Sequence, residues 1–252
     1  MKISELEAYL EQKTELTTEE IEALAGDSRR GAQELLKRFQ RRKQAGKDEL
    51  KRLERMLAEE KLLWDQGLSR IAGLDEAGRG PLAGPVVAAA VVFKPGTVIK
   101  YLNDSKQLSA KRREYFFEEI IFRSEAYGIG SASSVEIDQL NIHKASLLAM
   151  HRALGKMNLD PDYILVDGFP LPGCRCGQKA IIGGDARSLT IAAASVLAKV
   201  ARDRMMQRLH ELYPGYAFNR NMGYGTVEHR QAIVKYGLTP EHRRSFKLKE
   251  EF

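Results

Sequence analysis

Cysteine is almost absent from this sequence, which contains only Cys174 and Cys176. Because one residue separates the two, the pair is too close for an ordinary structural disulfide, and it supplies two ligands fewer than a Cys-type zinc site requires. The scarcity of cysteine therefore argues against a structural disulfide and against a zinc site of that type. We expect both side chains to be reduced thiols in a loop.

Long hydrophobic runs are also missing. No apolar run reaches the roughly 18 to 20 residues that a helix needs to span a bilayer. The start of the chain carries Glu5 and Glu7 and has no apolar core of the signal-peptide kind. We therefore expect a cytoplasmic protein that does not enter a membrane. Hydrophobic residues still make up 43% of the chain, which is ample for the buried core of a globular protein.

The first part of the chain lacks an excess of either charge. Residues 1–70 contain 15 of the 40 basic residues and 15 of the 34 acidic residues, so residues 71–252 hold the remaining 25 and 19 and the whole net charge of +6. The basic part is also the part that carries the acidic motifs. A basic surface around an acidic centre suits a polyanionic substrate, although a net charge of this size can also serve solubility alone.

A change in composition near residue 68 divides the chain. Residues 1–68 are rich in Glu, Lys, Arg, Gln and Leu, and they predict a small helical extension. One helix is predicted from Thr17 to about Gly26, and another from about Arg30 to Leu63 with Gly46 as its weak point. The extension could dock on the main domain, contact nucleic acid or simply be a solvated charged surface. Residues 69–252 are predicted to form the main domain, with a helical segment at its end.

Strand and helix signals alternate from Ile71 onward. Short connections between the first strands favour an antiparallel meander, and the later alternation with helices indicates an α/β fold, with a mixed sheet covered by helices on both faces. The predicted strands cover residues 71–74, 86–93, a weaker segment at 97–99, 126–132, 163–166 and 179–182. The predicted helices cover residues 109–123, 135–157 with an interruption near Asn141, 186–212 and 226–236.

Acidic residues stand where several predicted strands end. Carboxyl ends of strands are places where ligand sites collect, and two divalent ions about 4 Å apart need several converging carboxylates. Adjacent side chains of a regular strand point to opposite faces, so we expect the first strand to break before its two acids if both serve one site. The candidates are Asp75 and Glu76, directly before the turn Gly78-Arg79-Gly80, together with Asp167 and Asp185.

Each acid also has a purely structural interpretation. Asp75 could be an ordinary turn acid, and Asp167, which precedes a glycine, could form an Asx turn. Asp185 could cap the long helix that follows it, a role worth about 1 kcal/mol. Asp104 and Asp203 are weaker candidates for a metal site, because turn chemistry and helical charge spacing account for them.

Further residues could hold phosphate or sugar. Ser195 and Lys199 lie four residues apart on one predicted helix and could share a phosphate, although a solvated helix face explains them as well. Tyr224, between two glycines, could stack on a sugar or base or could pack in the core. The remaining candidates are Lys106, in a loop, and the turn Gly78-Arg79-Gly80, whose backbone N–H groups and guanidinium suit phosphate oxygens.

Several sequence blocks, taken together, resemble the motifs of bacterial ribonuclease HII, the type 2 ribonuclease H. The blocks keep the order of that family over most of the main domain, which makes the match specific. The resemblance implies an RNase H-like fold, with a mixed five-stranded sheet flanked by helices. The blocks are Gly73–Ala88, Asn103–Lys106, Leu165–Gly168, Gly184–Ala186 with Ala193–Val200, Gly223–Thr226 and His242–Phe246.

The resemblance also implies an activity. The family hydrolyses the RNA strand of RNA–DNA hybrids and incises DNA on the 5′ side of single embedded ribonucleotides, as in ribonucleotide excision repair, leaving 3′-hydroxyl and 5′-phosphate ends. Its partners are thus hybrid duplexes and ribonucleotide-containing DNA, and its cofactor is a pair of Mg²⁺ or Mn²⁺ ions. By motif, the metal-binding acids correspond to Asp75, Glu76, Asp167 and Asp185, and the junction-sensing tyrosine corresponds to Tyr224.

Two features depart from the family pattern. Met222 stands where relatives often have a basic residue, which puts one phosphate contact in doubt, and the extension occurs only in some longer members. Two other interpretations stay open. One is another nuclease of the same fold class, such as a type 3 ribonuclease H or a junction resolvase. The other is a non-catalytic nucleic-acid-binding module, against which the complete set of four acids argues.

Overall fold

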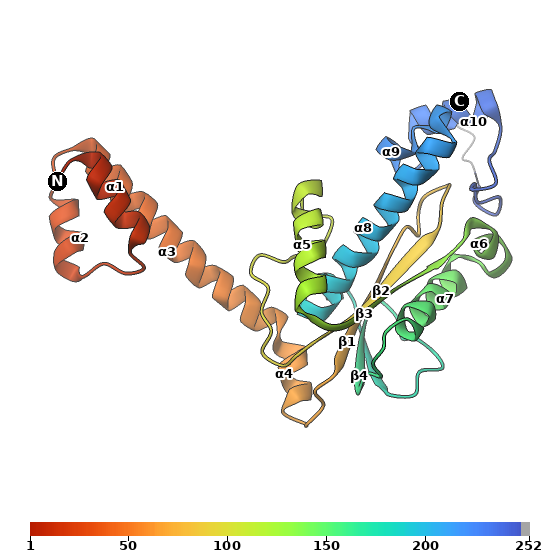
Figure 1. The fold of residues 1–252 in the computed structure, drawn as a ribbon, viewed down its shortest axis with the longest axis horizontal. Coiled ribbons are helices and arrows are strands. Elements are labelled where there is room, and N and C mark those ends of the chain that lie inside the picture. Colours follow the sequence, from red (N-terminus) through yellow and green to blue (C-terminus); the bar gives the residue numbers. More distant parts are fainter. Residues whose placement is uncertain (248–252) are drawn as a thin grey trace. The chain divides into compact units, whose positions relative to one another are not determined.

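Residues 1–247 are described by the computed structural model, in which the chain divides into two units, Met1–Glu54 and Arg55–Phe252 (Figure 1). The helix that leads out of the first unit, α3, covers Arg30–Met56. A domain boundary at residues 68 and 69 stays a prediction. Within the described part, no helix is long and apolar enough to cross a membrane.

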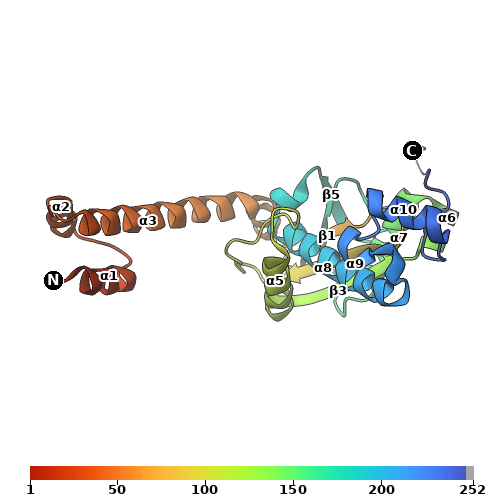
Figure 2. The ribbon, with the colours of Figure 1, turned by 90° about the horizontal axis from the view of Figure 1, so that it is seen from above.

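The N-terminal unit is a small helical cluster. It contains α1 (Ile3–Gln12), α2 (Thr18–Ala25) and most of α3, and Figure 2 shows α1 alongside α3. The predicted helix start at Thr17 is confirmed, because Thr17 Oγ1 accepts a hydrogen bond from the backbone N–H of Glu20 at 3.2 Å. The apolar side chains between the helices form a core of their own: Leu6, Leu10, Leu16, Ala32, Leu36 and Phe39.

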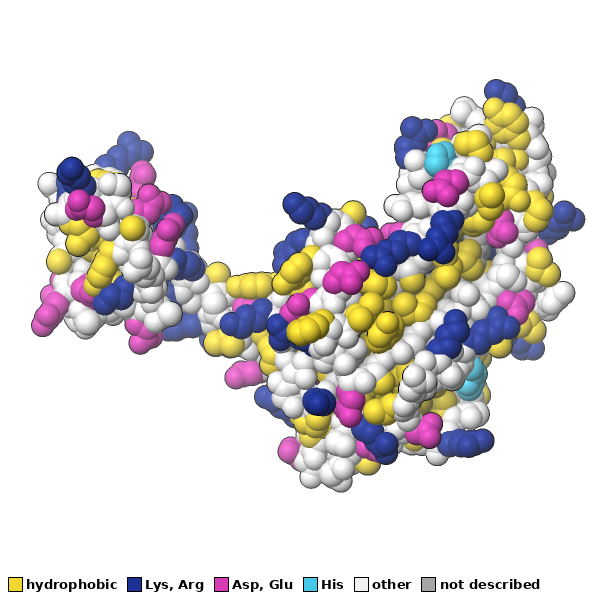
Figure 3. Space-filling view, in the orientation of Figure 1, with side chains coloured by type: hydrophobic (Ala, Val, Ile, Leu, Met, Phe, Trp, Pro, Cys, Tyr) yellow, Lys and Arg dark blue, Asp and Glu magenta, His cyan; other side chains and the backbone are white. Residues whose placement is uncertain are grey.

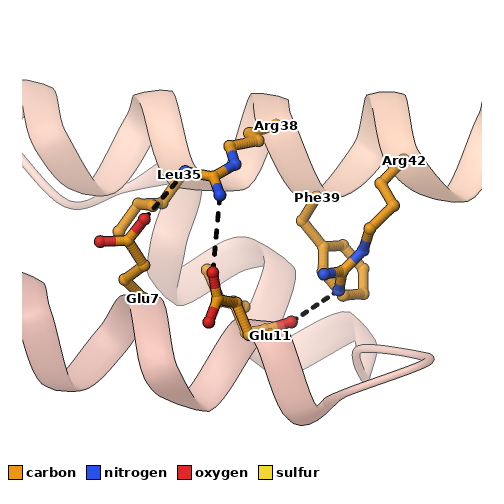
Figure 4. Close-up of a pocket in the computed structure, with 7 residues that line it drawn as sticks. Glu7, Glu11, Leu35, Arg38, Phe39 and Arg42 are labelled. Carbon is orange, nitrogen blue, oxygen red and sulfur yellow. Dashed lines mark hydrogen bonds and ion pairs between the residues drawn. The ribbon is translucent and has the colours of Figure 1, made fainter. Parts of the chain in front are cut away.

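Ion pairs and a backbone contact also join α1 to α3 (Figure 4). Arg38 Nη1 lies 2.8 Å from Glu7 Oε1, and Arg42 Nη2 donates to the carbonyl of Leu10 at 2.6 Å. These residues line a pocket of about 150 Å³. Arg38 and Arg42, two basic residues through which the extension could contact nucleic acid, therefore take part in holding the helices of this unit together.

The long helix of the extension does not break at its glycine. α3 continues through Gly46 and ends at Met56, and α4 (Ala58–Trp64) follows after Leu57. A glycine inside a helix costs only about 1 kcal/mol, which a helix of this length tolerates. Gly46 as the weak point of the helix was therefore wrong.

The second unit is built on a five-stranded mixed sheet, as predicted. Strands β1, β2 and β3 form the antiparallel meander, and β4 and β5 run parallel to β1, giving the order β3-β2-β1-β4-β5. The strand bounds are Ile71–Ala77, Val86–Phe93, Ser124–Ala132, Tyr163–Asp167 and Gly177–Ile181. The predicted strand at residues 97–99 is wrong: Ile99 is buried, but its backbone joins no neighbouring strand.

Helices cover both faces of the sheet. α7 (Ile142–Gly155) packs on β2 and β3, whereas α8 (Leu189–Leu212) packs on β1 and β2 from the other side. The close approach of α8 to β1 requires Gly73, since a Cβ there would lie 2.1 Å from the carbonyl carbon of Thr190. The remaining helices are α5 (Ala110–Arg123), α6 (Ser134–Leu140), α9 (Phe218–Asn221) and α10 (Val227–Tyr236).

Local sequence signals explain two further features. The predicted interruption near Asn141 is confirmed, because this residue has φ 70° and separates α6 from α7. Cys174 and Cys176 lie in the connection between β4 and β5 as free thiols, as predicted. Burial raises the pKa of both thiols, so they stay protonated and poorly nucleophilic at neutral pH.

Candidate active site

Three acidic side chains from different parts of the chain converge at one edge of the sheet. β1 and β4 are parallel neighbours, with Leu74 paired to Val166, so Asp75 and Asp167 follow the paired residues at the same edge. Asp185 lies in a short 3-10 turn, Gly184–Ala186, between β5 and α8. One carboxylate oxygen of each acid lies within 4.8 Å of those of the other two. The three acids thus form a cluster with the spacing of a metal site.

A backbone hydrogen bond fixes part of this cluster. The N–H of Gly184 donates to Asp167 Oδ1 at 2.7 Å, which brings the turn that carries Asp185 against the end of β4. The alternative role of Asp185 as a helix cap does not apply, because Ser188 caps α8 by accepting from the N–H of Ile191 at 3.2 Å. Asp185 therefore does not cap α8, although its position before that helix suggested this role.

Burial and mutual repulsion disfavour the charged forms of these acids. Burial, and then the charges of Glu76 and Asp167, raise the pKa of Asp75 well above its usual range. Burial, followed by the charges of Asp104 and Asp167, also raises the pKa of Asp185. Like charges this close favour a bound cation, and carboxylate oxygens are ligands that hard divalent ions prefer. The residues present therefore fit a divalent metal.

Glu76 differs from the three converging acids. The expected break of β1 before the acids is wrong, because β1 pairs with β2 through Ala77, so Asp75 and Glu76 occupy alternating positions of a regular strand. Glu76 lies 3.1 Å from Arg79 Nη1 through Oε1, and its buried Oε2 has no hydrogen-bond partner in the described residues. Burial raises the pKa of Glu76, and Arg79 opposes that shift. Glu76 as a metal ligand stays a prediction.

Both acids of β1 nevertheless reach one pocket of about 360 Å³. β1 continues beyond its last pair with β4, Leu74 with Val166, so its final residues have no strand neighbour on that side. The pocket is also lined by the residues proposed from sequence as substrate contacts. These are Gly78, Arg79, Gly80, Lys106, Ser195, Lys199 and Tyr224.

Polar side chains of the pocket contact the acids directly. Ser195, on α8, hydrogen-bonds Asp75, and its Oγ lies 2.9 Å from Ser105 Oγ. Lys106 Nζ lies 3.6 Å from Asp185 Oδ2. Burial acts to lower the pKa of Lys106, but the surrounding carboxylates outweigh it and raise that pKa. Lys106 is thus a permanent cation at the rim of the acidic cluster.

Lys199 forms an ion pair with Asp203, as the helical spacing of the two residues indicated. Its Nζ lies 2.7 Å from Asp203 Oδ1, one turn further along α8. Asp203 is thereby explained as an ion-pair partner, while Lys199 still lines the pocket. Tyr224 is 48% exposed, and a Cβ on Gly80 would lie 3.7 Å from its ring. Tyr224 is therefore a pocket residue rather than a core tyrosine.

Two buried arginines hold the loop between β1 and β2. Arg202, on α8, donates to the carbonyl of Pro85 at 3.0 Å and to that of Ala83 at 3.2 Å. Arg243 donates to the carbonyls of Gly78 at 2.6 Å and Arg79 at 2.9 Å. Burial lowers the pKa of both, that of Arg243 to about 9 with a contribution from the charge of Arg202.

Arg243 therefore holds this loop from a buried position, although it stands in a run of basic residues near the end of the chain. The sequence offered no signal for this role, because the carbonyls that Arg243 binds belong to a loop much earlier in the chain. The tight loop needs glycine: Gly78 has φ 95°, and a Cβ there would lie 2.0 Å from Arg202 Nε. The two arginines thus determine where the Gly78–Gly80 turn faces the pocket.

Glu60 is a second residue that sequence reasoning missed. It belongs to α4, a charged segment, yet it is 0% exposed. Its Oε1 accepts hydrogen bonds from Ser188 Oγ at 2.7 Å and from Thr190 N and Oγ1 at 3.1 and 3.0 Å. Burial raises the pKa of Glu60. This carboxyl anchors the start of α8, the helix that supplies Ser195 and Lys199.

Two protein-family models match this chain. The family model described as ribonuclease HII matches residues 72–249, and one described as the ribonuclease HII N-terminal domain matches residues 2–64. The chain belongs to the ribonuclease HII family. Members of this family are metal-dependent endoribonucleases that cut the RNA strand of RNA–DNA hybrids, and this chain is an enzyme of that kind.

Relatives match both units. Ribonuclease HII of Desulfitobacterium hafniense is 47% identical over 246 residues, which cover 98% of this chain and 94% of the relative. Ribonuclease HII of Geobacillus kaustophilus is 49% identical over 225 residues, covering 89% and 86%. The crystal structure of ribonuclease H2 from Pyrococcus horikoshii superposes with a TM-score of 0.61 at 27% identity, over 71% of this chain and 94% of that one. The fold is therefore RNase H-like, as predicted.

Proposed function

We propose that this ribonuclease HII family member incises duplex DNA on the 5′ side of a single embedded ribonucleotide, in addition to cutting the RNA strand of hybrids. The proposal includes a site for two Mg²⁺ or Mn²⁺ ions. One observation carries it: Asp75, Asp167 and Asp185 converge, and the first two line the pocket that also contains the Gly78–Gly80 turn and Tyr224. The reaction takes place in the cytoplasm under this proposal, where the enzyme meets DNA that contains ribonucleotides.

The acids supply the metal-binding part of this proposal. Asp75, Asp167 and Asp185 would hold the ions, and the unpartnered Oε2 of Glu76 would complete their ligand set. Oxygen ligands without sulfur or imidazole favour Mg²⁺ or Mn²⁺ over zinc. Ions held by these acids would supply an activated water and stabilisation of the departing 3′ oxygen, consistent with 3′-hydroxyl and 5′-phosphate ends.

The glycine turn and the tyrosine supply substrate recognition. The ribose 2′-hydroxyl is the group that distinguishes RNA from DNA, and a turn of glycines lets backbone groups approach it closely. Tyr224 stands beside Gly80 and exposes its ring to the pocket, so it can stack on the sugar next to the ribonucleotide. A sugar without a 2′-hydroxyl stacks more closely, which suits a DNA residue at that position.

Phosphate binding under this proposal depends on individual residues. On the face of the second unit seen in Figure 3, dark blue basic side chains occur in separate groups among acidic ones. Within the pocket, Lys106, Arg79 and Lys199 carry positive charge, and Ser195 offers a hydroxyl. Lys199 is shared with Asp203, so a phosphate has to compete for it. Met222 adds no charge where relatives often have a basic residue.

The test is a cleavage assay on a DNA duplex that contains one ribonucleotide, with and without Mg²⁺ and with the incision position mapped. We expect a single Mg²⁺-dependent cut on the 5′ side of the ribonucleotide and none in an all-DNA duplex. A long hybrid and a four-way junction are the comparison substrates. Cleavage of the hybrid alone would favour a type 3 activity, cleavage of the junction a resolvase, and metal-independent binding without products a non-catalytic module.

A further inference from the structure

Two buried histidines stand behind Tyr224. His229 lies in the first turn of α10, and His242 lies in the segment after that helix, where it forms a bridge with Ala83. Both are fully buried, and their Nε2 atoms are 3.1 Å apart. The rings of Tyr216 and Phe218 pack against the pair. The proposed reaction uses neither histidine, so their burial at this place needs an explanation.

The hydrogen bonds of the pair determine where its protons lie. The backbone N–H of Thr239 points at His242 Nδ1 at 2.9 Å, and a backbone N–H can only donate. His242 Nδ1 is therefore unprotonated, and the neutral ring carries its proton on Nε2, which donates to His229 Nε2. The proton of His229 is then on Nδ1, which donates to the carbonyl of Tyr224 at 2.9 Å. A single arrangement satisfies all four ring nitrogens.

This chain of hydrogen bonds ends on the residue that faces the substrate. Tyr224 is flanked by Gly223, with φ 80°, and Gly225, so its local backbone has wide conformational freedom. Its carbonyl is held by His229 and by the N–H of Thr226, at 2.8 Å. The pair therefore restrains a segment that its own sequence leaves loose.

The same C-terminal segment also holds the glycine turn. Arg243 follows His242 directly and donates to the carbonyls of Gly78 and Arg79. The segment that contains His242 and Arg243 thus makes two connections. Arg243 binds the glycine turn, and His242 is linked through His229 to the carbonyl of Tyr224. This connection holds the Gly78–Gly80 turn and Tyr224, which both line the pocket, in a defined position relative to each other.

We propose that His229 and His242 form a neutral positioning pair that sets Tyr224 against the Gly78–Gly80 turn and so determines incision at a single ribonucleotide. The inference rests on the proposed role of Tyr224. A long hybrid offers contacts along many nucleotides, whereas a lone ribonucleotide depends on the few residues that read it. The pair consequently affects incision at the embedded ribonucleotide more than cleavage of the hybrid.

Protonation of either ring breaks the arrangement. A proton on His242 Nδ1 faces the N–H of Thr239, and a proton on His229 Nε2 faces the N–H of His242. Among the described residues, the groups that contact the pair include Tyr216, Phe218, the N–H and hydroxyl of Thr239 and the Tyr224 carbonyl, and no carboxylate forms a hydrogen bond or ion pair with either ring. Burial lowers the pKa of His229, and burial and the charge of His229 lower that of His242 to about 4.

The experiment compares His229→Phe with His229→Asn in the full-length enzyme. The phenylalanine variant fills the ring space but cannot donate to Tyr224, whereas the asparagine Nδ2 stands near the place of Nδ1 and can. We expect His229→Phe to lower kcat/KM on the embedded ribonucleotide about fivefold relative to the long hybrid. We expect His229→Asn to restore most of the loss. Equal effects on both substrates, or no rescue by asparagine, would overturn the proposal.

A Tyr224 variant and an NMR measurement distinguish failure of the positioning pair from failure of the proposed role of Tyr224. Tyr224→Ala tests the role on which the inference rests: if it leaves incision at the embedded ribonucleotide unchanged, the proposed function of Tyr224 fails, and if it lowers incision while His229→Phe does not, only the positioning pair fails. Nitrogen NMR of the wild-type enzyme at neutral pH reads the protons directly and does not depend on a variant that folds. We expect a neutral Nε2–H form of His242 and a neutral Nδ1–H form of His229. Charged rings or the opposite forms would refute the pair.

Discussion

The backbone N–H of Gly184 donates a hydrogen bond to Asp167 Oδ1 at 2.7 Å, and this contact places Asp185 beside Asp167. The bond joins the end of β4 to the turn before α8, two segments that the sequence separates by a whole strand. Asp167 thus both accepts this bond and belongs to the acidic cluster, so the bond helps to hold two of the three acids together.

Asp75→Asn is expected to abolish cleavage while it preserves the fold. Asparagine keeps the size of the side chain but removes the charge at the centre of the three converging acids. Replacing even a residue that only supports metal ligands typically lowers metal affinity or activity about 10–100-fold, so we expect a loss of at least about a hundredfold. The measurement is turnover of a hybrid duplex at saturating Mg²⁺, with circular dichroism to check the fold.

Asp65→Asn is the matched control for this change, because Asp65 is exposed and belongs neither to the three converging acids nor to the lining of the pocket. It should cleave like the wild type. A folded Asp75→Asn protein with normal turnover would remove Asp75 from the metal site.

Stabilisation by Mg²⁺ is expected to grow as the pH rises. The pKa values of Asp75, Glu76 and Asp185 are raised, chiefly by burial. Such carboxyls bind protons more tightly in the folded chain, so the metal-free protein keeps their stabilising effect below the unfolded pKa and loses it as the pH rises through the folded pKa. A divalent ion offsets the repulsion that then appears. The rise in Tm on adding Mg²⁺ should therefore be larger at about pH 8 than at about pH 5.

Asp75→Asn serves as the control for this measurement as well, since it removes one of the titrating groups. Its Mg²⁺-dependent rise in Tm should be small at both pH values. A wild-type rise that does not change with pH would show that these acids do not bind the ion.

Glu60→Ala is expected to destabilise the protein by about 1–3 kcal/mol, because it leaves buried donors of Ser188 and Thr190 without an acceptor. Glu60→Gln should cost less, since its carbonyl oxygen can still accept. Glu59→Ala is the comparison: Glu59 is next in the chain and forms a surface ion pair with Lys179, worth about 0–1 kcal/mol. Urea unfolding measures all three. The explanation fails if the Glu59 variant loses as much stability as the Glu60 variant.

Truncations should show the same role for α4. A chain beginning at Arg55 retains Glu60, whereas a chain beginning at Leu68 lacks it. We expect the longer form to unfold at a clearly higher temperature than the shorter one in a thermal melt. Equal Tm values for the two forms would mean that Glu60 does not support the start of α8.

Arg243→Lys is expected to destabilise the second unit by about 3 kcal/mol, because lysine cannot reproduce the planar set of donors that binds Gly78, Arg79 and Gly84. The KM for hybrid substrate should also rise, since the glycine turn loses its support. Arg244→Lys is the matched control, as the Arg244 side chain is exposed. Chemical unfolding and steady-state kinetics test the pair of variants. Indistinguishable behaviour of the two would contradict a loop-holding role for Arg243.

Sequence alone predicted most of the second unit because its signals are local. The apolar run of β2 and the caps of α5 and α10 act within a few residues of each other. The same reasoning failed at residues 97–99, where a buried isoleucine was taken for a strand, and at Gly46, where helix length outweighed a single glycine. Burial and strand pairing are different properties, and a short apolar segment does not distinguish them.

The candidate site divides in the same way. Motif resemblance named the four acids and Tyr224 and implied that all four acids hold the ions, but it did not say what brings them together. Only the parallel pairing of β1 with β4 and the Gly184 contact bring three of them within 4.8 Å. β1 stays regular through Ala77 where a break was expected, and Glu76 lies outside the group of three acids although it lines the same pocket.

The sequence by itself determined the family, the alternation of strands and helices, and the residue types that can bind metal and phosphate. The tertiary structure decided the parts played by Glu60, Arg202, Arg243 and the pair His229–His242. The physical reason is the nature of their partners: backbone carbonyls, a helix start and another ring, each supplied by a distant segment. A side chain that binds a local neighbour leaves a spacing in the sequence, whereas one that binds a distant backbone atom leaves none.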